Sequence, residues 1–316
     1  MSNPKALSSE ELLNLFKSRG MSVNDTDIEK IKHINYYKLK DFAHPLCKIT
    51  KINGVAEISY AGVTFQDVLR RYYQDKNLRI FLLHAIEKIE VSIKTTLSHV
   101  MGLKYGAFGY LNFWLWANRD TYTKFQIEEK QYKLKKNILK SLPKQRSAEF
   151  KNINNLDPDK FPSIWLAIDV LTFGDVVMML EIMNEAMLRK IAAEYGASAV
   201  EFLSWVKCLH FIRNICAHNS NLIDVKLKTK PKCRKEWGQY LYFIQSKKDP
   251  NKKTPTNRLA VVICIAIHLV KTINPKYKLA NIQRSISSLC NKSEDMAKLL
   301  GFNTLNDARK ISFVIQ

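Results

Sequence analysis

The residues best suited to chemistry lie in one short stretch, Arg213-Asn214-Ile215-Cys216-Ala217-His218. At about 100° per residue on a helix, Asn214 and His218 share one face and Arg213 flanks it. Histidine can take or give a proton near neutral pH, and arginine stays charged and matches phosphate oxygens. This set suits RNA cleavage without a metal. His218 would handle the proton of the attacking 2′-hydroxyl or of the leaving oxygen, and Arg213 would stabilise charge on the phosphate.

Two other interpretations of this stretch remain. The Arg-x4-His spacing alone also fits an exposed arginine beside a histidine that caps a helix. The presence of Cys208, His210, Cys216 and His218 suggests zinc, but on one helix Cys208 and Cys216 are roughly 12 Å apart in axial rise, too far to share an ion. We therefore expect no metal and no cofactor. Six scattered cysteines without a Cys-x-x-Cys pair indicate reduced thiols, and we expect His84, His99 and His210 to be structural.

The charge of the chain favours a polyanionic partner. Fifty Lys and Arg against 29 Asp and Glu give a formal net charge of +21, although a basic surface can also serve solubility alone. Residues 130–146 carry seven basic and no acidic side chains, and residues 226–258 carry eleven basic and two acidic ones. The candidate RNA-binding residues are Tyr36, Tyr37, Lys130, Lys133, Lys136, Lys140, Arg146, Lys226, Lys228, Lys230, Lys232, Arg234 and Lys235.

Aromatic side chains are interleaved with the second basic stretch, and two interpretations fit them equally. They could stack on bases of single-stranded RNA, or they could form the core face of a helix whose lysines face solvent. The four residues are Trp237, Tyr240, Tyr242 and Phe243.

The elements that must position the motif are helices, since apolar residues recur at helical spacing and glycine and proline are few. A helix over residues 197–217 carries the motif at its end. The clearest helix follows Thr64 as N-cap and has an apolar stripe from Leu78 to Val100, with Glu90 and Lys94 predicted on its exposed face. Further helices are predicted over 8–19, from about 24, from 130 until Pro143 closes the helix, and over 163–183, 259–270 and 295–313.

The sequence therefore predicts an all-α fold, and Asn53-Gly54 between short β-compatible runs is compatible with one small β-hairpin. The longest apolar stretch, residues 259–270, is shorter than the ~20 residues of a membrane span and reads as a buried helix. The N-terminal residues lack the pattern of a signal peptide. We expect a cytoplasmic protein that does not interact with membranes.

Several motifs occur in the order found in one known family. They are Ile34-Asn35-Tyr36-Tyr37-Lys38-Leu39, Thr64-Phe65, Tyr73, Asp75, Leu78-Arg79, Ile86-Glu87-Lys88-Ile89-Glu90-Val91, Tyr105-Gly106, Pro162-Ser163-Ile164-Trp165, Phe173-Gly174 and the Arg213–His218 stretch. Over residues 30–222 the chain resembles the Abi-like abortive-infection proteins of the D and F type. That family is similar to the HEPN superfamily of compact helical domains, which commonly pair their Arg-His motifs and are often metal-independent endoribonucleases.

The resemblance implies roles for particular residues. Arg213, Asn214 and His218 occupy the catalytic motif, and Asp169 stands four residues after Trp165, where the family usually has Glu, so that it could hold the Arg or the His. The family commonly continues with a second histidine followed by Arg-Leu-Trp-Asn. Here Asn219 follows His218, which leaves the Arg-His pair intact but without a neighbouring second histidine. We expect Asn219 to be a supporting residue of the site.

These observations lead to one prediction and one alternative. The prediction is a HEPN-like helical bundle with additional helices: an N-terminal helical segment over 1–60, a core over 61–225 and a basic helical region over 226–316. It would act as a toxin-like, metal-independent endoribonuclease in phage defence, regulated by a small structured noncoding RNA, as a homodimer or an RNA-scaffolded oligomer. The alternative is a non-catalytic RNA-binding protein that forms a stable particle with a small noncoding RNA. A DNA-binding regulator is disfavoured, because no recognition-helix turn is evident.

Overall fold

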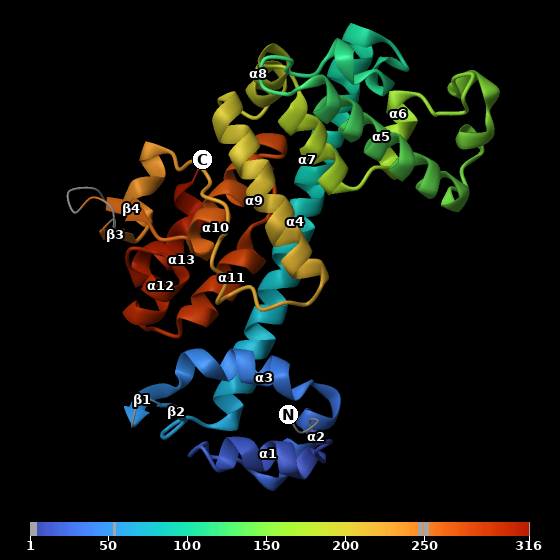
Figure 1. Ribbon diagram of the computed structural model, residues 1–316. Helices are drawn as coiled ribbons and strands as arrows, with labels where there is room; N and C mark the ends of the chain where they lie inside the picture. Colours follow the sequence, from blue (N-terminus) through green and yellow to red (C-terminus); the bar gives the residue numbers. More distant parts are fainter. Residues whose placement is uncertain (1–4, 53–54, 246–248, 250–252, 316) are drawn as a thin grey trace.

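One long helix organises the molecule. In the computed structural model, which describes residues 5–52, 55–245, 249 and 253–315, α4 (Phe65–Tyr105) runs for 41 residues, or roughly 60 Å. Thr64 caps it as predicted, in a capping box with Asp67, and Gly106 ends it at φ 76°. Figure 1 shows the other elements arranged along its length, and α3, α6, α8, α9, α10 and α11 all contact it.

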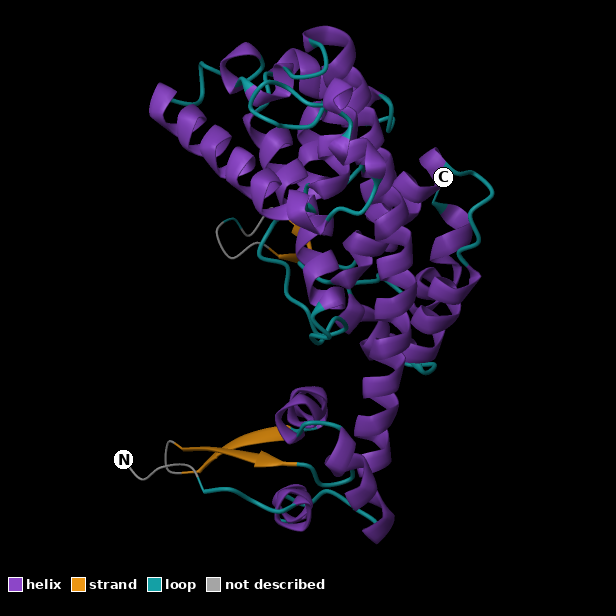
Figure 2. Ribbon diagram, turned by 90° about the vertical axis from the view of Figure 1, so that its right-hand side faces the viewer, coloured by secondary structure: helices purple, strands orange, loops and turns teal. Residues whose placement is uncertain are grey.

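The N-terminal elements gather at the first turns of α4 (Figures 1 and 2). They are α1 (Ser9–Lys17), α2 (Ile28–His33), α3 (Tyr36–Ala43) and an antiparallel hairpin of β1 (Lys48–Ile52) and β2 (Val55–Ser59). Short 3-10 turns η1 (Asp25–Asp27) and η2 (His44–Leu46) connect them. The predicted hairpin is confirmed, whereas its turn residues 53 and 54 lie outside the described residues. A second small hairpin, β3 (Phe243–Gln245) with β4 (Lys253–Pro255), was not predicted.

The middle of the chain folds against the second half of α4. It forms α5 (Lys124–Ser141), α6 (Ile164–Val170), α7 (Phe173–Ile182), α8 (Glu185–Ala193) and α9 (Ala199–Ala217). The 3-10 turns in this part are η3 (Gly109–Leu111), η4 (Phe113–Leu115), η5 (Leu142–Lys144), η6 (Ala148–Lys151) and η7 (Ile153–Asn155). The single helix predicted over 163–183 is wrong: it breaks at residues 171–172, because Thr172 starts a new capping box with Asp175.

The C-terminal part packs on α4 through α10 (Leu259–Ile273) and α11 (Ala280–Cys290), after the 3-10 turn η8 (Lys235–Tyr240). The single helix predicted over 295–313 is also wrong, since the chain forms α12 (Glu294–Leu300) and α13 (Leu305–Val314). Gly301, at φ 95°, ends the first helix, and Thr304 caps the second with Asp307. The domain boundaries predicted after residues 60 and 225 stay predictions.

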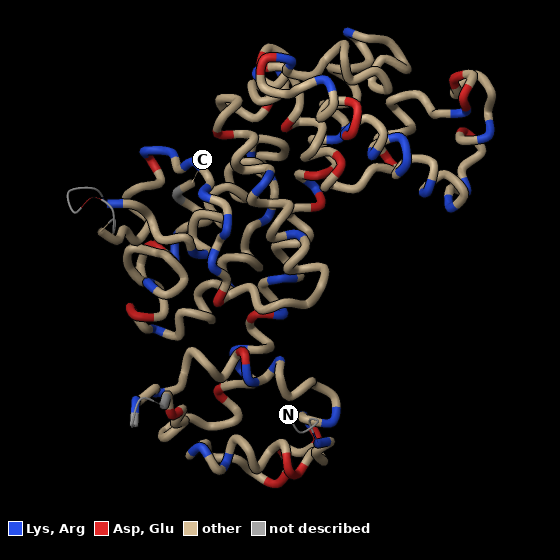
Figure 3. The backbone as a smooth tube through the Cα atoms, in the orientation of Figure 1, with Lys and Arg blue, Asp and Glu red and all other residues tan. Residues whose placement is uncertain are grey.

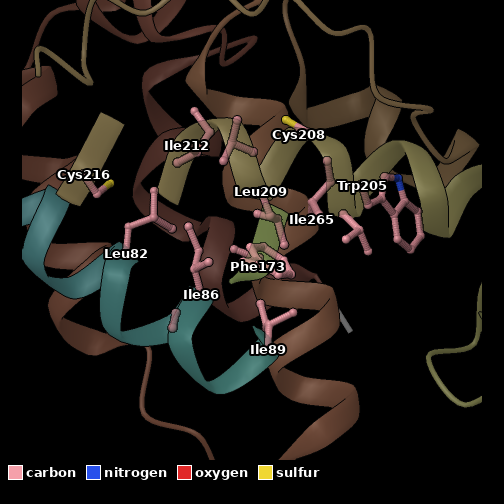
Figure 4. Close-up of a cluster of buried hydrophobic side chains, with 14 of the residues drawn as sticks. Leu82, Ile86, Ile89, Phe173, Trp205, Cys208, Leu209, Ile212, Cys216 and Ile265 are labelled. Carbon is pink, nitrogen blue, oxygen red and sulfur yellow. The ribbon is translucent and has the colours of Figure 1, made fainter. Parts of the chain in front are cut away.

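The core is formed where α4, α7, α9 and α10 meet, as Figure 4 shows for Leu82, Ile86, Ile89, Phe173, Trp205, Leu209, Ile212 and Ile265. Every residue from 259 to 270 is buried, so the predicted buried helix is confirmed. Among the described residues, no helix has the length and apolar character needed to cross a membrane. The chain thus has the all-α fold that the sequence predicts, with two small hairpins added.

Candidate functional site

The motif forms the C-terminal end of α9. Ser198 starts this helix as N-cap, accepting a hydrogen bond from the backbone of Glu201. The apolar face is buried against α4 and α7, and Figure 4 shows Ile212 and Cys216 on the side that faces α4. On the other faces, Arg213 and Asn214 are half-buried and His218 is exposed. The fold thus leaves all three predicted groups accessible at one helix end.

The helix ends at His218 for a local reason. Asn219 adopts the left-handed conformation (φ 54°), in which asparagine is strained less than most residues. The backbone N–H of Ser220 donates to the Ile215 carbonyl (3.0 Å) and that of Asn219 to the Cys216 carbonyl (3.3 Å), the two bonds of a Schellman motif. His218 is therefore the C-cap residue that follows Ala217, the last residue of α9, and its side chain stands at the end of the helix.

Arg213 is held loosely by a carboxylate on α4. Its Nε lies 3.8 Å from Oε2 of Glu90, and its side chain is 40% exposed. Glu90 also pairs with Lys94 (3.1 Å). The sequence placed Glu90 and Lys94 on an exposed face, but their side chains are only 13% and 16% exposed, because α9 packs over this part of α4. Arg213 is oriented by Glu90 and still accessible to a phosphate.

Asn214 is positioned by a histidine one turn earlier on α9. Its Nδ2 lies 3.2 Å from Nε2 of His210, where a neutral ring can accept the amide hydrogen. Burial lowers the pKa of His210, and the charge of Arg213 lowers it further, so the neutral ring is favoured. Gly174 makes room for this ring, since a Cβ there would lie 3.1 Å from Nε2. His210 is thus a structural residue, as the sequence predicted, and its structural role is to position Asn214.

The residue after the motif is fixed by two cations from distant parts of the chain. Arg79 on α4 donates from Nη1 to Oδ1 of Asn219 at 2.8 Å. Lys38 on α3 donates from Nζ to the backbone carbonyl of Asn219. The side chain and the carbonyl of Asn219 thus join the end of α9 to both α4 and α3, and the supporting role of this residue in catalysis stays a prediction.

A fully buried carboxylate holds the next residues. Asp75 Oδ1 accepts the backbone N–H groups of Leu222 (2.8 Å) and Ile223 (3.0 Å), and its Oδ2 accepts from Arg79 Nε at 2.6 Å. Burial raises the pKa of Asp75, while Arg79 and the two amides oppose that rise by stabilising the charged form. We call the buried pair of Asp75 and Arg79, which together hold residues 219, 222 and 223, the clamp.

The clamp is reinforced one turn earlier on α4. Arg71 Nη2 pairs with Oδ1 of Asp224 at 2.7 Å, and both side chains are largely buried. The other carboxylate oxygen of Asp224 accepts from Asn221 Nδ2 (2.8 Å), and its carbonyl accepts from Arg258 (3.1 Å). Residues 219–224 are therefore fixed at nearly every position. In the sequence, Asp75 and Arg79 stand out only through the family resemblance. An acidic and a basic residue four positions apart in an apolar stretch nevertheless indicate a buried ion pair.

Asp169 lies elsewhere in relation to the motif. It is exposed on α6, and among the described residues neither Arg213 nor His218 forms an ion pair or hydrogen bond with it. The carboxylate that faces Arg213 is Glu90. The carboxylate next to the motif therefore comes from the helix beneath it, α4, and not from α6.

The thiols of the motif helix are not disposed to bind a metal. Cys208 and Cys216 are buried along one helix, and burial raises the pKa of each to about 12, so both stay protonated. All six cysteines are free. Within the described residues, no group of three or more His, Cys, Asp or Glu could hold a metal ion.

Most of the predicted RNA-binding cations are exposed, and Figure 3 shows Lys and Arg spread over all parts of the backbone. On and after α5 the exposed ones are Lys133, Lys136, Lys140 and Arg146, while Lys130 lies over the Tyr122 ring. In the second stretch they are Lys226, Lys228, Lys230, Lys232 and Lys235. Arg234 differs, because it lies against the Trp205 and Trp237 rings and pairs with Glu201.

The aromatic candidates divide by burial. Tyr36 is buried with its ring 5.0 Å from that of Phe16, whereas Tyr37 is 70% exposed. Tyr36 is thus occupied by the core, and Tyr37 remains free to stack. Trp237 is buried against Trp205, which favours the core interpretation for that residue. Tyr240, Tyr242 and Phe243 are partly buried.

Comparison with known proteins agrees with the resemblance seen in the sequence. A family model of Abi-like proteins matches residues 29–224, which include α3, α4, the Arg213–His218 motif and the clamped residues after it. No curated protein and no solved structure matches the chain. Since the matched range covers more than half of the 316 residues, the chain belongs to the Abi-like protein family, and this membership points to phage defence by abortive infection.

Proposed function

We propose that this Abi-like protein is a metal-independent endoribonuclease of the HEPN type whose active site is Arg213, Asn214 and His218. The observation that carries the proposal is the end of α9, where an arginine, an amide and a histidine stand accessible on a backbone held by buried charges. The net charge of +21 supports a polyanionic substrate.

The reaction follows from the chemistry of these groups. His218 takes the proton of a ribose 2′-hydroxyl as that oxygen attacks the adjacent phosphorus. The bond from phosphorus to the 5′-oxygen breaks, and this oxygen takes up a proton from water as it leaves, while His218 afterwards returns its proton to solvent. The products are a 2′,3′-cyclic phosphate and a 5′-hydroxyl. Arg213 stabilises the charge that grows on the phosphate oxygens, and Asn214 orients the phosphate. DNA lacks the attacking hydroxyl and is not a substrate.

Regulation and assembly are part of the proposal. A small structured noncoding RNA occupies the basic surface and restrains cleavage, and the enzyme acts as a homodimer or when assembled on RNA in the cytoplasm. The exposed cations on α5 and on residues 226–235 support a role in binding RNA beyond the cleavage site.

The test measures cleavage of RNA in the presence of EDTA by wild type, His218→Ala and Arg213→Ala. We expect each substitution to lower the cleavage rate by about 100-fold or more, and a single 2′-deoxy substitution at the cut position to block wild-type cleavage. In cells, toxicity and RNA shortening should be lost together.

The matched controls are His99→Ala and Arg189→Ala. His99 is exposed and comes nine residues after Glu90 on α4, which places it on the opposite side of that helix. Arg189 is an exposed arginine paired with Glu185 on α8. Both controls should cleave like wild type. Unchanged cleavage and toxicity in His218→Ala would refute the catalytic assignment.

The alternative function, a non-catalytic RNA-binding particle, is favoured by one observation. Asn219 stands beside His218 and its side chain is engaged by Arg79, so that position supplies no second proton-transfer group. Purification from cells separates the two functions. A bound RNA of one discrete length with intact cellular RNA would favour the particle, whereas shortened cellular RNA requires cleavage.

A further inference from the structure

A hollow lies beside the motif at the contact between α3 and the clamped residues. Its volume is about 420 Å³, within the ~300–1,000 Å³ range of small-molecule sites. One wall comes from α3 and η2, where Tyr37, Lys40, Asp41 and His44 follow an i, i+3, i+4, i+7 spacing that places them on one helix face. Asn221 and Asp224 form the opposite wall. We call this hollow the α3 pocket.

The second wall is rigid and already neutralised. Asp224 is bound through one carboxylate oxygen to Arg71 and through the other to Asn221. The side-chain Oδ1 of Asn221 in turn accepts the Asp224 backbone N–H at 3.2 Å. This wall presents fixed polar atoms to a ligand without adding free negative charge.

The first wall is accessible and unoccupied by other side chains. Tyr37 is 70% exposed, and its ring touches Tyr36 only edge-on, at a centroid distance of 5.5 Å and an angle of 72°. Asp41 and His44 are exposed, and Lys40 is half-buried. The pocket therefore combines an aromatic face, an acceptor-only carboxylate and a cation.

The position of the pocket relates it to the motif. Lys38, the neighbour of Tyr37, binds the carbonyl of Asn219, the residue that follows His218. Asn221 comes three residues after His218, which is at most about 10–11 Å of extended chain. A group bound in the α3 pocket is thus close to the RNA position whose 2′-hydroxyl His218 would deprotonate.

We propose that the α3 pocket binds a nucleobase of single-stranded RNA next to the cleavage position, with a preference for guanine over uracil; this rests on the proposed ribonuclease function. Tyr37 stacks on the base, as aromatic side chains do with unpaired RNA bases. Asp41 accepts hydrogen bonds from the adjacent N1–H and N2–H donors of guanine, whereas uracil has no exocyclic amino group. Lys40 binds the neighbouring phosphate.

The experiment measures binding without cleavage. In the His218→Ala background, fluorescence anisotropy follows two 12-nucleotide RNAs, one of uridine only and one with two central guanosines. We expect tighter binding of the guanosine RNA. Tyr37→Ala should weaken its binding by about tenfold, in line with the loss of one stacked base, and Tyr37→Phe should retain it. Asp41→Asn should reduce the difference between the two RNAs while leaving the affinity for the uridine RNA in place.

Tyr132→Ala is the matched control, because this tyrosine on α5 is also 70% exposed and lies outside the pocket; the ratio of the two affinities should not change. The proposal is overturned if Tyr37→Ala and Asp41→Asn leave both affinities at the level of the His218→Ala parent. That result is distinguishable from failure of the ribonuclease, which would show as wild-type protein that cuts no RNA while base preference still depends on Tyr37 and Asp41.

Discussion

The two sides of the motif are held in opposite ways. After His218, the backbone is fixed by Asp75 and Arg79, which are 0% and 5% exposed in their side chains and 2.6 Å apart. Before it, Arg213 meets Glu90 at 3.8 Å and is 40% exposed. In the first pair the charged atoms are close together, buried and joined to further hydrogen-bond partners. In the second pair the charged atoms are farther apart, and the arginine is open to solvent.

The buried pair therefore supports the backbone, and the accessible arginine is the group suited to chemistry. A buried ion pair contributes geometry, because removing either partner leaves an uncompensated charge. A half-exposed pair orients a side chain at little energetic cost and lets it change partner. The end of α9 is therefore placed accurately, while Arg213 stays accessible for the phosphate contact that the proposed function requires.

The largest effect is expected from breaking the clamp with Arg79→Met. Asp75 would lose its guanidinium partner inside the core, and the free energy of unfolding should fall by about 3–5 kcal/mol, as measured by chemical denaturation. Cleavage should fall as well, since Asn219 loses the bond that fixes the residue after His218.

Two variants sharpen this test. Arg70→Met removes an exposed pair with Asp67 on the same helix and should cost under about 1 kcal/mol. Adding Asp75→Asn to Arg79→Met should recover part of the lost stability by removing the unpaired charge. A loss in Arg79→Met no larger than in Arg70→Met would show that the clamp contributes no stability.

An intermediate effect is expected from pH through His210. The folded protein lowers the pKa of this ring below its usual 6.5, so the unfolded chain binds a proton first as the pH falls. Stability from this group is present above pH about 6.5 and is lost as the pH falls through the folded pKa. Denaturation curves between pH 7.5 and 5 should show this loss, and the loss should shrink in His210→Gln.

Several charged side chains face His210 and influence its pKa. Arg213 lowers its pKa, while Glu90, Glu181 and Asp175 act in the opposite direction. His99→Gln, a change at an exposed histidine of α4, should keep the wild-type dependence on pH. If His210→Gln and wild type lose the same stability over this range, His210 does not titrate in the way its burial implies.

A smaller effect on stability than that of Arg79→Met is expected from Glu90→Gln on the loosely held side. Glu90 pairs with the exposed Arg213 and also with the largely buried Lys94, so the loss in the free energy of unfolding should exceed that of an exposed pair, under about 1 kcal/mol, and stay below the ~3–5 kcal/mol of the fully buried pair. The cleavage rate should nevertheless fall, because Arg213 loses its orienting partner, whereas affinity for RNA should not fall, since a negative charge is removed. Glu185→Gln, which breaks an exposed pair on α8, should leave both quantities unchanged; a weaker RNA affinity in Glu90→Gln would contradict this account.

Local sequence signals predicted most of the helical elements, and the errors were also local. Thr64 and Ser8 were correctly identified as helix starts, because an N-cap needs only the next three residues. The breaks at residues 171–172 and 301–304 were missed although Thr172-Asp175 and Thr304-Asp307 repeat the same pattern. In both cases a continuous apolar periodicity masked the cap.

The sequence by itself determined the all-α fold, the Abi-like family and the placement of Asn214 and His218 on one helix face, because these depend on composition, motif order and helical period. Only the tertiary structure decided which residues surround the motif. Arg79 meets Asn219 across 140 positions and Lys38 meets it across 181, and Glu90 rather than Asp169 faces Arg213. Such partners are chosen by how helices pack on α4, and no short-range pattern encodes that packing.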